Sequence, residues 1–198
     1  MDSGQSTERQ DRPNFCSAPS DSEPMYLVIS TSLNPDSRSR VLARSAHTTI
    51  VESAGQANAN WIDLAERSLP ACNGADCYGH AEVVEISAAI SAAHGILIAA
   101  PIYNYDLGAA AKNLIELTGK AWTGKIVGFA CAAGGQGSYM APMQLANSLM
   151  LDFRSMILPQ FVYATGDCFQ GDSISDSDVQ QRVTGLANEL VRVATALN

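Results

Sequence analysis

The sequence contains no long apolar run and no excess of positive charge. None of its apolar stretches approaches the ~20 residues that a helix needs to span a bilayer, so we expect no membrane segment. The net charge of −8 argues against general binding to nucleic acids or to anionic membrane surfaces. The first residues also lack the basic start and apolar core of a secretory signal, so we expect a cytoplasmic location.

Paired cysteine motifs are missing as well. The number of cysteines is odd and no Cys-x-x-Cys pair is present, so we expect free thiols in a reducing compartment. The five cysteines are Cys16, Cys72, Cys77, Cys131 and Cys168. Cys72 and Cys77 lie near His80, but their spacing fits no common zinc site and a fourth ligand is missing, so we predict no metal.

Common motifs for nucleotide binding and hydrolysis are also absent. The sequence has no Gly-x-Gly-x-x-Gly of dinucleotide folds, no Gly-Lys-Ser/Thr of P-loop nucleotide hydrolases, and no Gly-x-Ser-x-Gly elbow of serine hydrolases. His47, His80 and His94 lie apart from the loops described below, so no acid–base residue stands out. The composition is otherwise ordinary, and 198 residues are enough for one domain with a substantial core.

The chain does contain an alternation of strand-like and helix-like segments. Residues 1–24 are polar, and we predict a disordered tail there, followed by one domain over residues 25–198. The predicted strands are 25–30, 60–64, 95–100, 125–131 and 156–164, the last interrupted by Pro159. The predicted helices are 39–53, 81–93, 109–118, 139–153 and 178–197, the last capped by Ser175 or Ser177.

This alternation predicts an α/β fold in which helices cover both faces of a five-stranded parallel sheet, a three-layer sandwich. In the strand order 2-1-3-4-5, ligands bind beyond the carboxyl ends of the strands, where the order reverses between the first and third strands. The unusual loops of this sequence follow the first, third and fourth predicted strands. All three are therefore expected to border one crevice.

The loop after the first strand is crowded with hydroxyl groups, and a local cluster of arginines begins within it. Its potential hydrogen-bond donors are Ser30, Ser32, Ser37, Arg38 and Ser39. Because the loop opens a helix, whose N-terminus carries a partial positive charge, it suits the terminal phosphate of a ligand. The alternative is that Ser37 or Ser39 caps the helix, and that Arg38, Arg40 and Arg44 are solvated.

Two further loops suit a flat heterocycle. Residues 101–108 carry a proline, two tyrosines and an asparagine, groups that can border a ring and read its polar edge. Residues 132–138 are rich in glycine, which allows a backbone to approach a ligand closely, and they add Gln136 and Ser138 as polar contacts. The alternatives are a turn with surface tyrosines in the first case and a purely geometric turn in the second.

Together these segments resemble the NAD(P)H-dependent FMN reductase family of flavodoxin-like proteins, which includes FMN, azo, chromate and quinone reductases. The resemblance covers roughly residues 25–165. Its most specific part is Pro-Ile-Tyr-Asn at 101–104, followed by the Ala-Lys-Asn helix of residues 109–117. The other matching segments are Ser30–Leu33, Ser37–Ser39, Gly124–Val127 and Gly134–Gly135.

The resemblance implies an FMN site. It places the FMN phosphate among Ser30, Ser32, Ser37, Arg38 and Ser39. It places the isoalloxazine ring and ribityl chain beside Pro101, Ile102, Tyr103 and Asn104. It places Ala133, Gly134, Gly135 and Gln136 on the opposite side of the ring. Three positions depart from the family pattern: Ser30 replaces a glycine, Asn34 replaces an arginine, and Ile102 stands where many members have Glu or Val. We therefore assign the phosphate to the serines and Arg38, and leave Asn34 unassigned.

The resemblance also implies a reaction. Hydride would pass from C4 of NADPH or NADH to N5 of FMN, and onward to free flavin, a quinone or another small acceptor, with no acid–base side chain required. A homodimer or homotetramer is implied as well, and the apolar faces of 109–117 and 139–150 could serve it unless they only pack on the sheet. Two other functions stay open: an FMN-binding electron carrier without nicotinamide turnover, and a phosphosugar or nucleotide-binding module.

Overall fold

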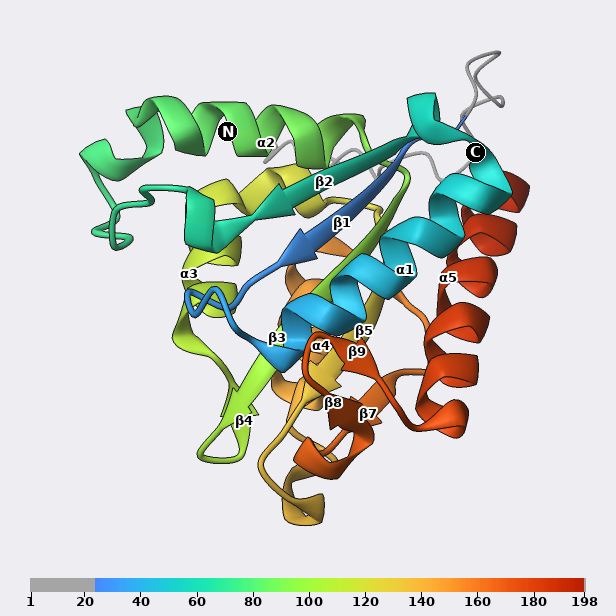
Figure 1. Ribbon diagram of the computed structural model, residues 1–198. Helices are drawn as coiled ribbons and strands as arrows, with labels where there is room; N and C mark the ends of the chain where they lie inside the picture. The colour runs from blue at the N-terminus through green and yellow to red at the C-terminus, as the bar shows by residue number, and fades with distance from the viewer. Residues whose placement is uncertain (1–23, 198) are drawn as a thin grey trace, which may run out of the picture.

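A mainly parallel sheet forms the centre of the computed structural model, which describes residues 24–197 (Figure 1). In spatial order its strands are β2 (Ala59–Asp63), β1 (Tyr26–Ser30), β3 (Gly95–Tyr103), β5 (Ile126–Ala132) and an edge made of β6 (Met156–Ile157) and β7 (Val162–Ala164). This order confirms the predicted 2-1-3-4-5 arrangement of a flavodoxin-like fold. The predicted tail, with Cys16, lies outside the described residues except for Pro24.

The sheet has seven strands, two more than predicted. The fifth predicted strand is split, because Pro159 lacks the backbone N–H that a continuous ladder needs. Both resulting strands, β6 and β7, pair with β5 in parallel. The other additional strand is β4 (Asp106–Leu107), which pairs with the end of β3 in antiparallel orientation.

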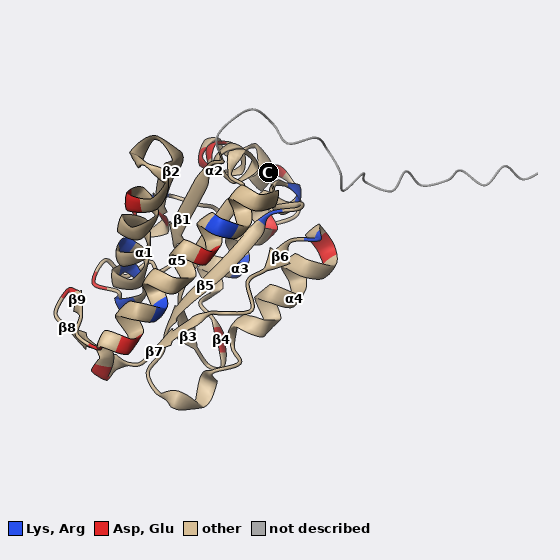
Figure 2. Cartoon of the chain, turned by 90° about the vertical axis from the view of Figure 1, so that its right-hand side faces the viewer, with Lys and Arg blue, Asp and Glu red and all other residues tan. Residues whose placement is uncertain are grey.

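Helices cover both faces of the sheet, as predicted. On one face lie α1 (Arg38–Ala54) and α5 (Ser177–Leu197), and on the other lie α2 (Ala81–Ala92), α3 (Ala109–Thr118) and α4 (Pro142–Phe153). Figure 2 shows the sheet between α1 and α5 on one side and α4 on the other. Short 3-10 turns lie at Gln56–Asn58, Leu64–Glu66, Asp76–Gly79, Gly119–Trp122, Gln136–Ser138 and Gly166–Cys168, and β8 (Phe169–Gln170) and β9 (Ser173–Ile174) form a small hairpin.

The first strand shows why the fold forms around these segments. Leu27 and Ile29 point into the core beneath α2, α3 and α4, whereas Tyr26 and Val28 point into the core beneath α1 and α5. A strand that is buried on both faces reads as a continuous apolar run. Each fully buried Leu, Ile or Val side chain contributes roughly 1.5–3 kcal/mol to folding, so the two apolar layers hold the sheet between its helices.

Two helix starts differ from the predicted ones. The last helix is capped by Asp176, whose Oδ1 accepts hydrogen bonds from the backbone N–H groups of Asp178 (2.9 Å) and Val179 (3.0 Å), so the prediction of Ser175 or Ser177 was wrong. A carboxylate serves both as a cap and as a favourable charge at a helix N-terminus. Helix α4 begins at Pro142 instead of residue 139, in keeping with the preference of proline for the first helical turn.

The cysteines within residues 24–197 carry free thiols. Cys77, Cys131 and Cys168 are buried, and Cys72 is half-buried. In this part of the chain no three His, Cys, Asp or Glu side chains gather in a way that could hold a metal ion. Every helix described here is too short or too polar to cross a membrane.

His94 makes the folding stability depend on pH. Its Nδ1 accepts a hydrogen bond from the backbone N–H of Met25 (3.0 Å), which joins the starts of β1 and β3. Burial, and then the nearby charge of Lys125, hold the pKa of His94 below its usual value of 6.5. As the pH falls towards and below 6.5, the unfolded chain therefore binds more protons than the folded chain. The stability that the neutral His94 side chain contributes is lost as the pH falls further.

We expect the free energy of unfolding to decrease between about pH 7.5 and about pH 5.5, and to decrease less in the His94→Gln variant. Urea unfolding curves at the two pH values measure this difference. His80→Gln is the matched control, because His80 is exposed and should leave the pH dependence as in the parent protein. Equal pH dependence in His94→Gln and the parent would contradict the role of His94.

Candidate functional site

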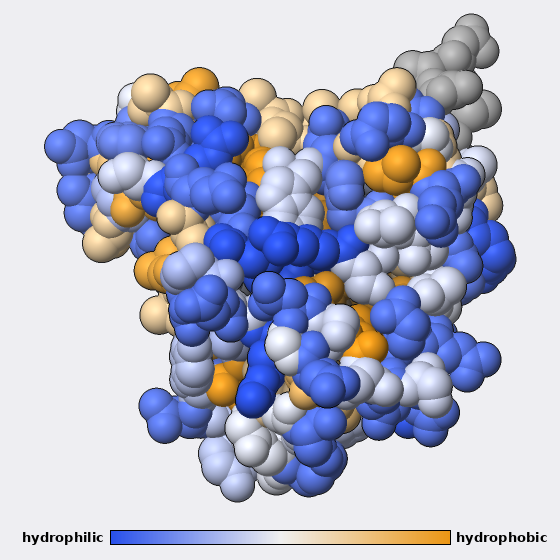
Figure 3. Space-filling model, in the orientation of Figure 1, coloured by the Kyte–Doolittle hydropathy of each residue, from blue (hydrophilic) through white to orange (hydrophobic). Residues whose placement is uncertain are grey.

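The three loops predicted to converge do meet at the carboxyl edge of the sheet. They enclose a cavity of about 340 Å³, within the range of ~300–1,000 Å³ that is typical of ligand pockets. Its lining residues are Asn34, Asp36, Ser37, Arg38, Ser39, Pro101, Ile102, Tyr103, Ala132, Ala133 and Gly134. Figure 3 shows mainly polar residues on the face of the molecule seen in Figure 1, with apolar residues visible between them.

The N-terminus of α1 opens into this cavity without a side-chain cap. Ser37 occupies the N-cap position, but its hydroxyl makes no hydrogen bond to the helix amides and instead pairs with the Ser39 hydroxyl (2.7 Å). The interpretation of Ser37 as a simple helix cap was therefore wrong. The first amides of an uncapped helix are available to an anion, and the two buried hydroxyls lie beside them.

Ser30 and Ser32 lie deeper, behind the cavity wall. Ser30 is fully buried at the end of β1, and its hydroxyl has no hydrogen-bond partner among the described residues. The Ser32 hydroxyl accepts a hydrogen bond from the backbone N–H of Asn34 (3.2 Å), and the Asn34 side chain accepts one from Asp36 (3.0 Å). These contacts give the loop its shape and bring Asn34 and Asp36, which were not predicted as site residues, to the cavity.

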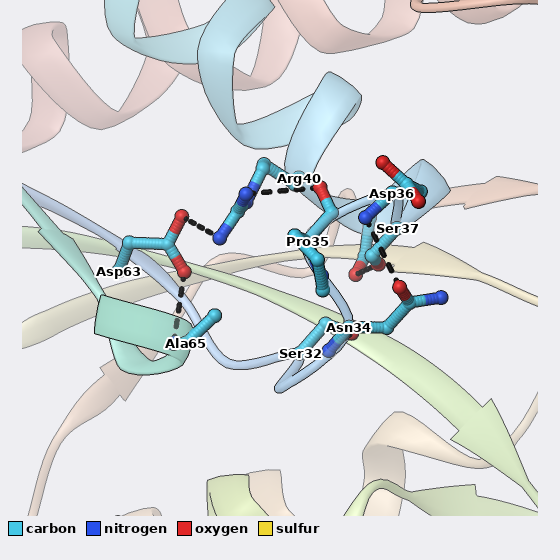
Figure 4. Close-up of polar contacts among 9 residues, drawn as sticks. Ser32, Asn34, Pro35, Asp36, Ser37, Arg40, Asp63 and Ala65 are labelled. Carbon is cyan, nitrogen blue, oxygen red and sulfur yellow. Dashed lines mark hydrogen bonds and ion pairs between the residues drawn. The ribbon is translucent and has the colours of Figure 1, made fainter. Parts of the chain in front are cut away.

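Figure 4 shows Arg40 between Asp63 and this loop. Its Nη2 lies 2.5 Å from Asp63 Oδ2, and its Nη1 donates a hydrogen bond to the backbone oxygen of Pro35 (2.9 Å). Asp63 in turn accepts a hydrogen bond from the backbone N–H of Ala65 (3.1 Å). Arg40 is therefore not a solvated member of a basic cluster, because it is buried and ties the loop to the end of β2.

Arg38 is exposed and lies against a fourth segment of the chain, Thr165–Phe169. Its guanidinium carbon lies 6.0 Å from the centre of the Phe169 ring. It also covers Gly166, where an added Cβ would lie only 2.3 Å from Nη1. The hydroxyl of Thr165 and then the charge of Arg38 contribute to holding the pKa of Asp167 below its usual value. This segment directly follows β7, and the sequence signal that could have identified it is a polar Thr-Gly-Asp after an apolar strand.

The segment predicted as a loop after β3 is a tight hairpin. Strand β3 continues through Pro101 to Tyr103, and Asn104 and Tyr105 form the turn with φ of 51° and 65°. Two positive φ values are typical of the turn that joins two strands directly. Pro101, Ile102 and Tyr103 line the cavity, whereas Asn104 does not. The tip of the hairpin approaches the opposite loop, since an added Cβ on Gly137 would lie 3.1 Å from the Tyr105 hydroxyl.

The glycine-rich loop after β5 forms the opposite wall. Ala133 and Gly134 line the cavity, but Gly135 and Gln136 do not. Gly135 accepts a short hydrogen bond from the Tyr163 hydroxyl through its backbone oxygen, and Gln136 Nε2 donates to the Thr165 hydroxyl (3.4 Å). A Cβ added at Gly134 would meet no atom within 4 Å, so the space beside this residue is open. The absence of a side chain there leaves space for a ligand.

The structure thus brings most of the predicted site residues together. Those that line the cavity are Ser37, Arg38, Ser39, Pro101, Ile102, Tyr103, Ala133 and Gly134. Those that lie behind it or beside it are Ser30, Ser32, Asn104, Gly135 and Gln136. The lining residues that sequence reasoning did not assign are Asn34, Asp36 and Ala132.

Solved structures of low sequence identity share this fold. An oxidoreductase from Corynebacterium diphtheriae superposes with a TM-score of 0.72 at 21% identity, over 89% of this chain and 100% of that chain. The flavoenzyme NAD(P)H:(acceptor) oxidoreductase FerB from Paracoccus denitrificans gives 0.68 at 20% identity, over 86% and 97%. An FMN-dependent NADH-azoreductase from Bacillus anthracis, solved in complex with FMN, gives 0.59 at 15% identity, over 85% and 100%.

A comparison with curated proteins finds no significant match. The model of the NADPH-dependent FMN reductase family matches residues 24–169, which include the three loops that line the cavity and the segment Thr165–Phe169 beside Arg38. This match confirms the resemblance inferred from the sequence. The chain therefore belongs to the NADPH-dependent FMN reductase family, and it is a flavin-dependent oxidoreductase with a flavodoxin-like fold.

Proposed function

We propose that this enzyme binds FMN in the cavity at the carboxyl edge of the sheet and uses NADPH or NADH to reduce free flavin, a quinone or another small acceptor. The observation that carries the proposal is the cavity itself. An uncapped helix N-terminus, an arginine, an aromatic wall and a glycine wall come from segments far apart in the sequence and meet around one space. This combination suits a ligand with a phosphate at one end and a flat ring at the other.

The phosphate end of the cavity has the donors that a phosphomonoester needs. The amides of the first turn of α1 and the hydroxyls of Ser37 and Ser39 lie together, and Arg38 adds a positive charge. The buried Ser30 hydroxyl, which has no partner among the described residues, is a further donor close to this loop. Charge-assisted hydrogen bonds of this kind are stronger than those between neutral groups, so this end would provide much of the binding energy.

The other end of the cavity has two walls that suit the flavin ring. Pro101, Ile102 and Tyr103 border one side, and Ala133 and the open Gly134 border the other. FMN held between these walls would supply the chemistry of two-electron transfer from the nicotinamide. The protein's part is to hold the ring, orient it and leave one face open to the nicotinamide and then to the acceptor, which is why no acid–base side chain is needed.

A spectrum of the purified protein and an anaerobic titration test this proposal. We expect flavin absorbance in the purified protein or after addition of FMN, and bleaching of that absorbance when NADPH or NADH is added. Protein that shows no flavin absorbance and does not bind added FMN would overturn the proposal. Flavin-loaded protein that neither nucleotide reduces would instead favour the electron carrier without nicotinamide turnover.

The Gly166→Ala variant tests whether the position of Arg38 matters for FMN. A methyl group at this position would collide with the guanidinium, and the flexible side chain must move while the backbone stays in place. We expect FMN affinity to fall by roughly 10-fold, the value of one charge-assisted contact, with little change in melting temperature. Fluorescence titration of FMN measures the affinity.

Gly79→Ala is the matched control for this variant, because an added Cβ at Gly79 would meet no atom within 4 Å. It should bind FMN as the parent protein does. Unchanged FMN affinity in Gly166→Ala would show that Arg38 does not need its present position to bind FMN.

We also propose that the protein forms a homodimer or homotetramer. Met150 and Leu151 of α4 are exposed, as is Met140 just before this helix, and large apolar side chains on a surface often mark an interface. A cavity of about 680 Å³ lies beside Leu151, between α3 and α4 and away from the four segments around the proposed flavin cavity. Light scattering coupled to size-exclusion chromatography measures the oligomeric state. A cytoplasmic location stays a prediction of the sequence.

A further inference from the structure

The connection from β2 to α2 brings two cysteines together outside the proposed flavin cavity. Cys77 is buried in a small apolar cluster with Val83 and Leu117, and Cys72 packs against this cluster from its half-buried position. The Cys72 side chain also acts to lower the pKa of the Cys77 thiol, and its sulfur lies 3.7 Å from the Tyr78 hydroxyl. The two cysteines thus belong to one small cluster, although five positions separate the residues in the sequence.

The backbone between the two cysteines is folded back and held in place. The Asn73 side-chain oxygen accepts hydrogen bonds from the backbone N–H groups of Ala75 (3.0 Å) and Cys77 (3.4 Å). Upstream, Asn113 accepts a hydrogen bond from the backbone N–H of Cys72 (2.8 Å) and donates one to the backbone oxygen of Pro70 (2.9 Å). The loop that a covalent bond between the sulfur atoms would close is therefore already formed, so little chain entropy remains to be lost.

The surroundings of Cys77 also favour its reactive form. Burial acts to raise the pKa of its thiol, but backbone groups of Asn73, Gly74 and Ala75 form hydrogen bonds with the sulfur, and the net pKa lies below the usual value. Cys131 shows the opposite behaviour, because its complete burial raises the pKa of its thiol. The thiolate is the nucleophile in thiol oxidation, so Cys77 should react before Cys131.

We propose that Cys72 and Cys77 are a site of reversible oxidation to a disulfide, with hydrogen peroxide as the oxidant. The Cys77 thiolate attacks one peroxide oxygen, the O–O bond breaks, and protonation of the leaving oxygen gives a sulfenic acid and one water. The Cys72 sulfur then attacks the Cys77 sulfur, the S–O bond breaks, and a second water leaves. Two thiols and one hydrogen peroxide become one disulfide and two waters, and the two electrons lost by sulfur reduce the peroxide.

Peptide mass spectrometry of the whole protein tests this proposal. The only lysine or arginine residues that bound the segment are Arg67 and Lys112, so one tryptic peptide, 68–112, carries Cys72 and Cys77 and no other cysteine. After a brief treatment with hydrogen peroxide and then iodoacetamide, we expect this peptide to have lost two hydrogen atoms and to carry no alkyl group. Reduction with dithiothreitol before alkylation should restore two alkyl groups on the same peptide.

Two variants test the order of the steps. In Cys72→Ser, the sulfenic acid on Cys77 has no partner thiol, so dimedone should trap it after peroxide treatment. In the control Cys168→Ser, the internal disulfide of peptide 68–112 should form as in the parent protein. The proposal is overturned if both thiols of the parent protein remain alkylated after peroxide, or if the peptide becomes linked to Cys16 or Cys168 instead. These readouts need no FMN, so their failure is distinct from failure of the proposed function.

Discussion

Replacing Arg38 by alanine is expected to weaken FMN binding by roughly 10- to 100-fold, because a hydrogen bond to a charged group contributes about 1.5–3 kcal/mol. Arg38 is the one cation among the described residues that line the cavity, and it is the first residue of α1, whose first turn is uncapped. The side chain is exposed, so its removal should leave the melting temperature almost unchanged. Fluorescence titration of the flavin-free protein with FMN measures the loss of affinity.

Two further variants make the Arg38 experiment specific. Arg44→Ala removes an equal charge from the exposed side of the same helix and should bind FMN as the parent protein does. Arg38→Lys keeps the charge but not the planar, forked set of donors, so we expect an intermediate affinity. Equal losses in Arg38→Ala and Arg44→Ala would show that only the overall charge of the protein matters. No loss in Arg38→Ala would remove this residue from the phosphate site.

Replacing Asp63 by alanine should have the largest effect on stability, about 3–5 kcal/mol of the free energy of unfolding. Its side chain and that of Arg40 are only 1% and 9% exposed, so the variant leaves a guanidinium charge buried without its partner. Urea unfolding and the melting temperature measure this loss. The surface pair of Arg67 and Glu85, at 3.0 Å with exposed fractions of 29% and 61%, is the control, and Arg67→Ala should cost at most about 1 kcal/mol.

A double variant separates stability from function in this pair. Arg40→Met combined with Asp63→Leu replaces both charges by apolar groups of similar size, and such exchanges are often neutral or stabilising. We therefore expect the double variant to recover most of the lost stability. It should not recover full FMN affinity, because the hydrogen bond from Arg40 to the backbone oxygen of Pro35 is gone. The loop between β1 and α1 is then no longer fixed by this contact. Full recovery of both would show that Arg40 has no part in shaping the site.

The order of the strands and the position of the cavity were predictable because both depend on local patterns. The continuous apolar run of β3 requires burial on both faces, and helices that alternate with such strands lead to a parallel sheet. The carboxyl ends of parallel strands lie on one edge, so loops after the first, third and fourth predicted strands had to meet there. Most of the predicted residues line the cavity for this reason.

Other features required contacts between distant parts of the chain. Asp63 and Arg40 are brought together because the parallel register of β1 and β2 sets Asp63 opposite Ser30, at the entry to the loop that Arg40 holds. Nothing within either segment identifies the other as its partner. Likewise, Gly166 meets Arg38 only because β7 lies at the far edge of the sheet and the chain then turns back towards α1.

The amino-acid sequence by itself determined the alternation of strands and helices, the family of the protein and the set of loops that surround the cavity. These follow from hydrophobic periodicity and from short sequence motifs, and both are local signals that involve only residues close together in the sequence. The tertiary structure alone decided which arginine faces the cavity and which is buried, and it placed Cys72 against the cluster that contains Cys77. Those outcomes depend on contacts between side chains that are distant in the sequence. Burial removes water from such contacts, so a charge or hydrogen-bond donor left without a partner there costs more free energy.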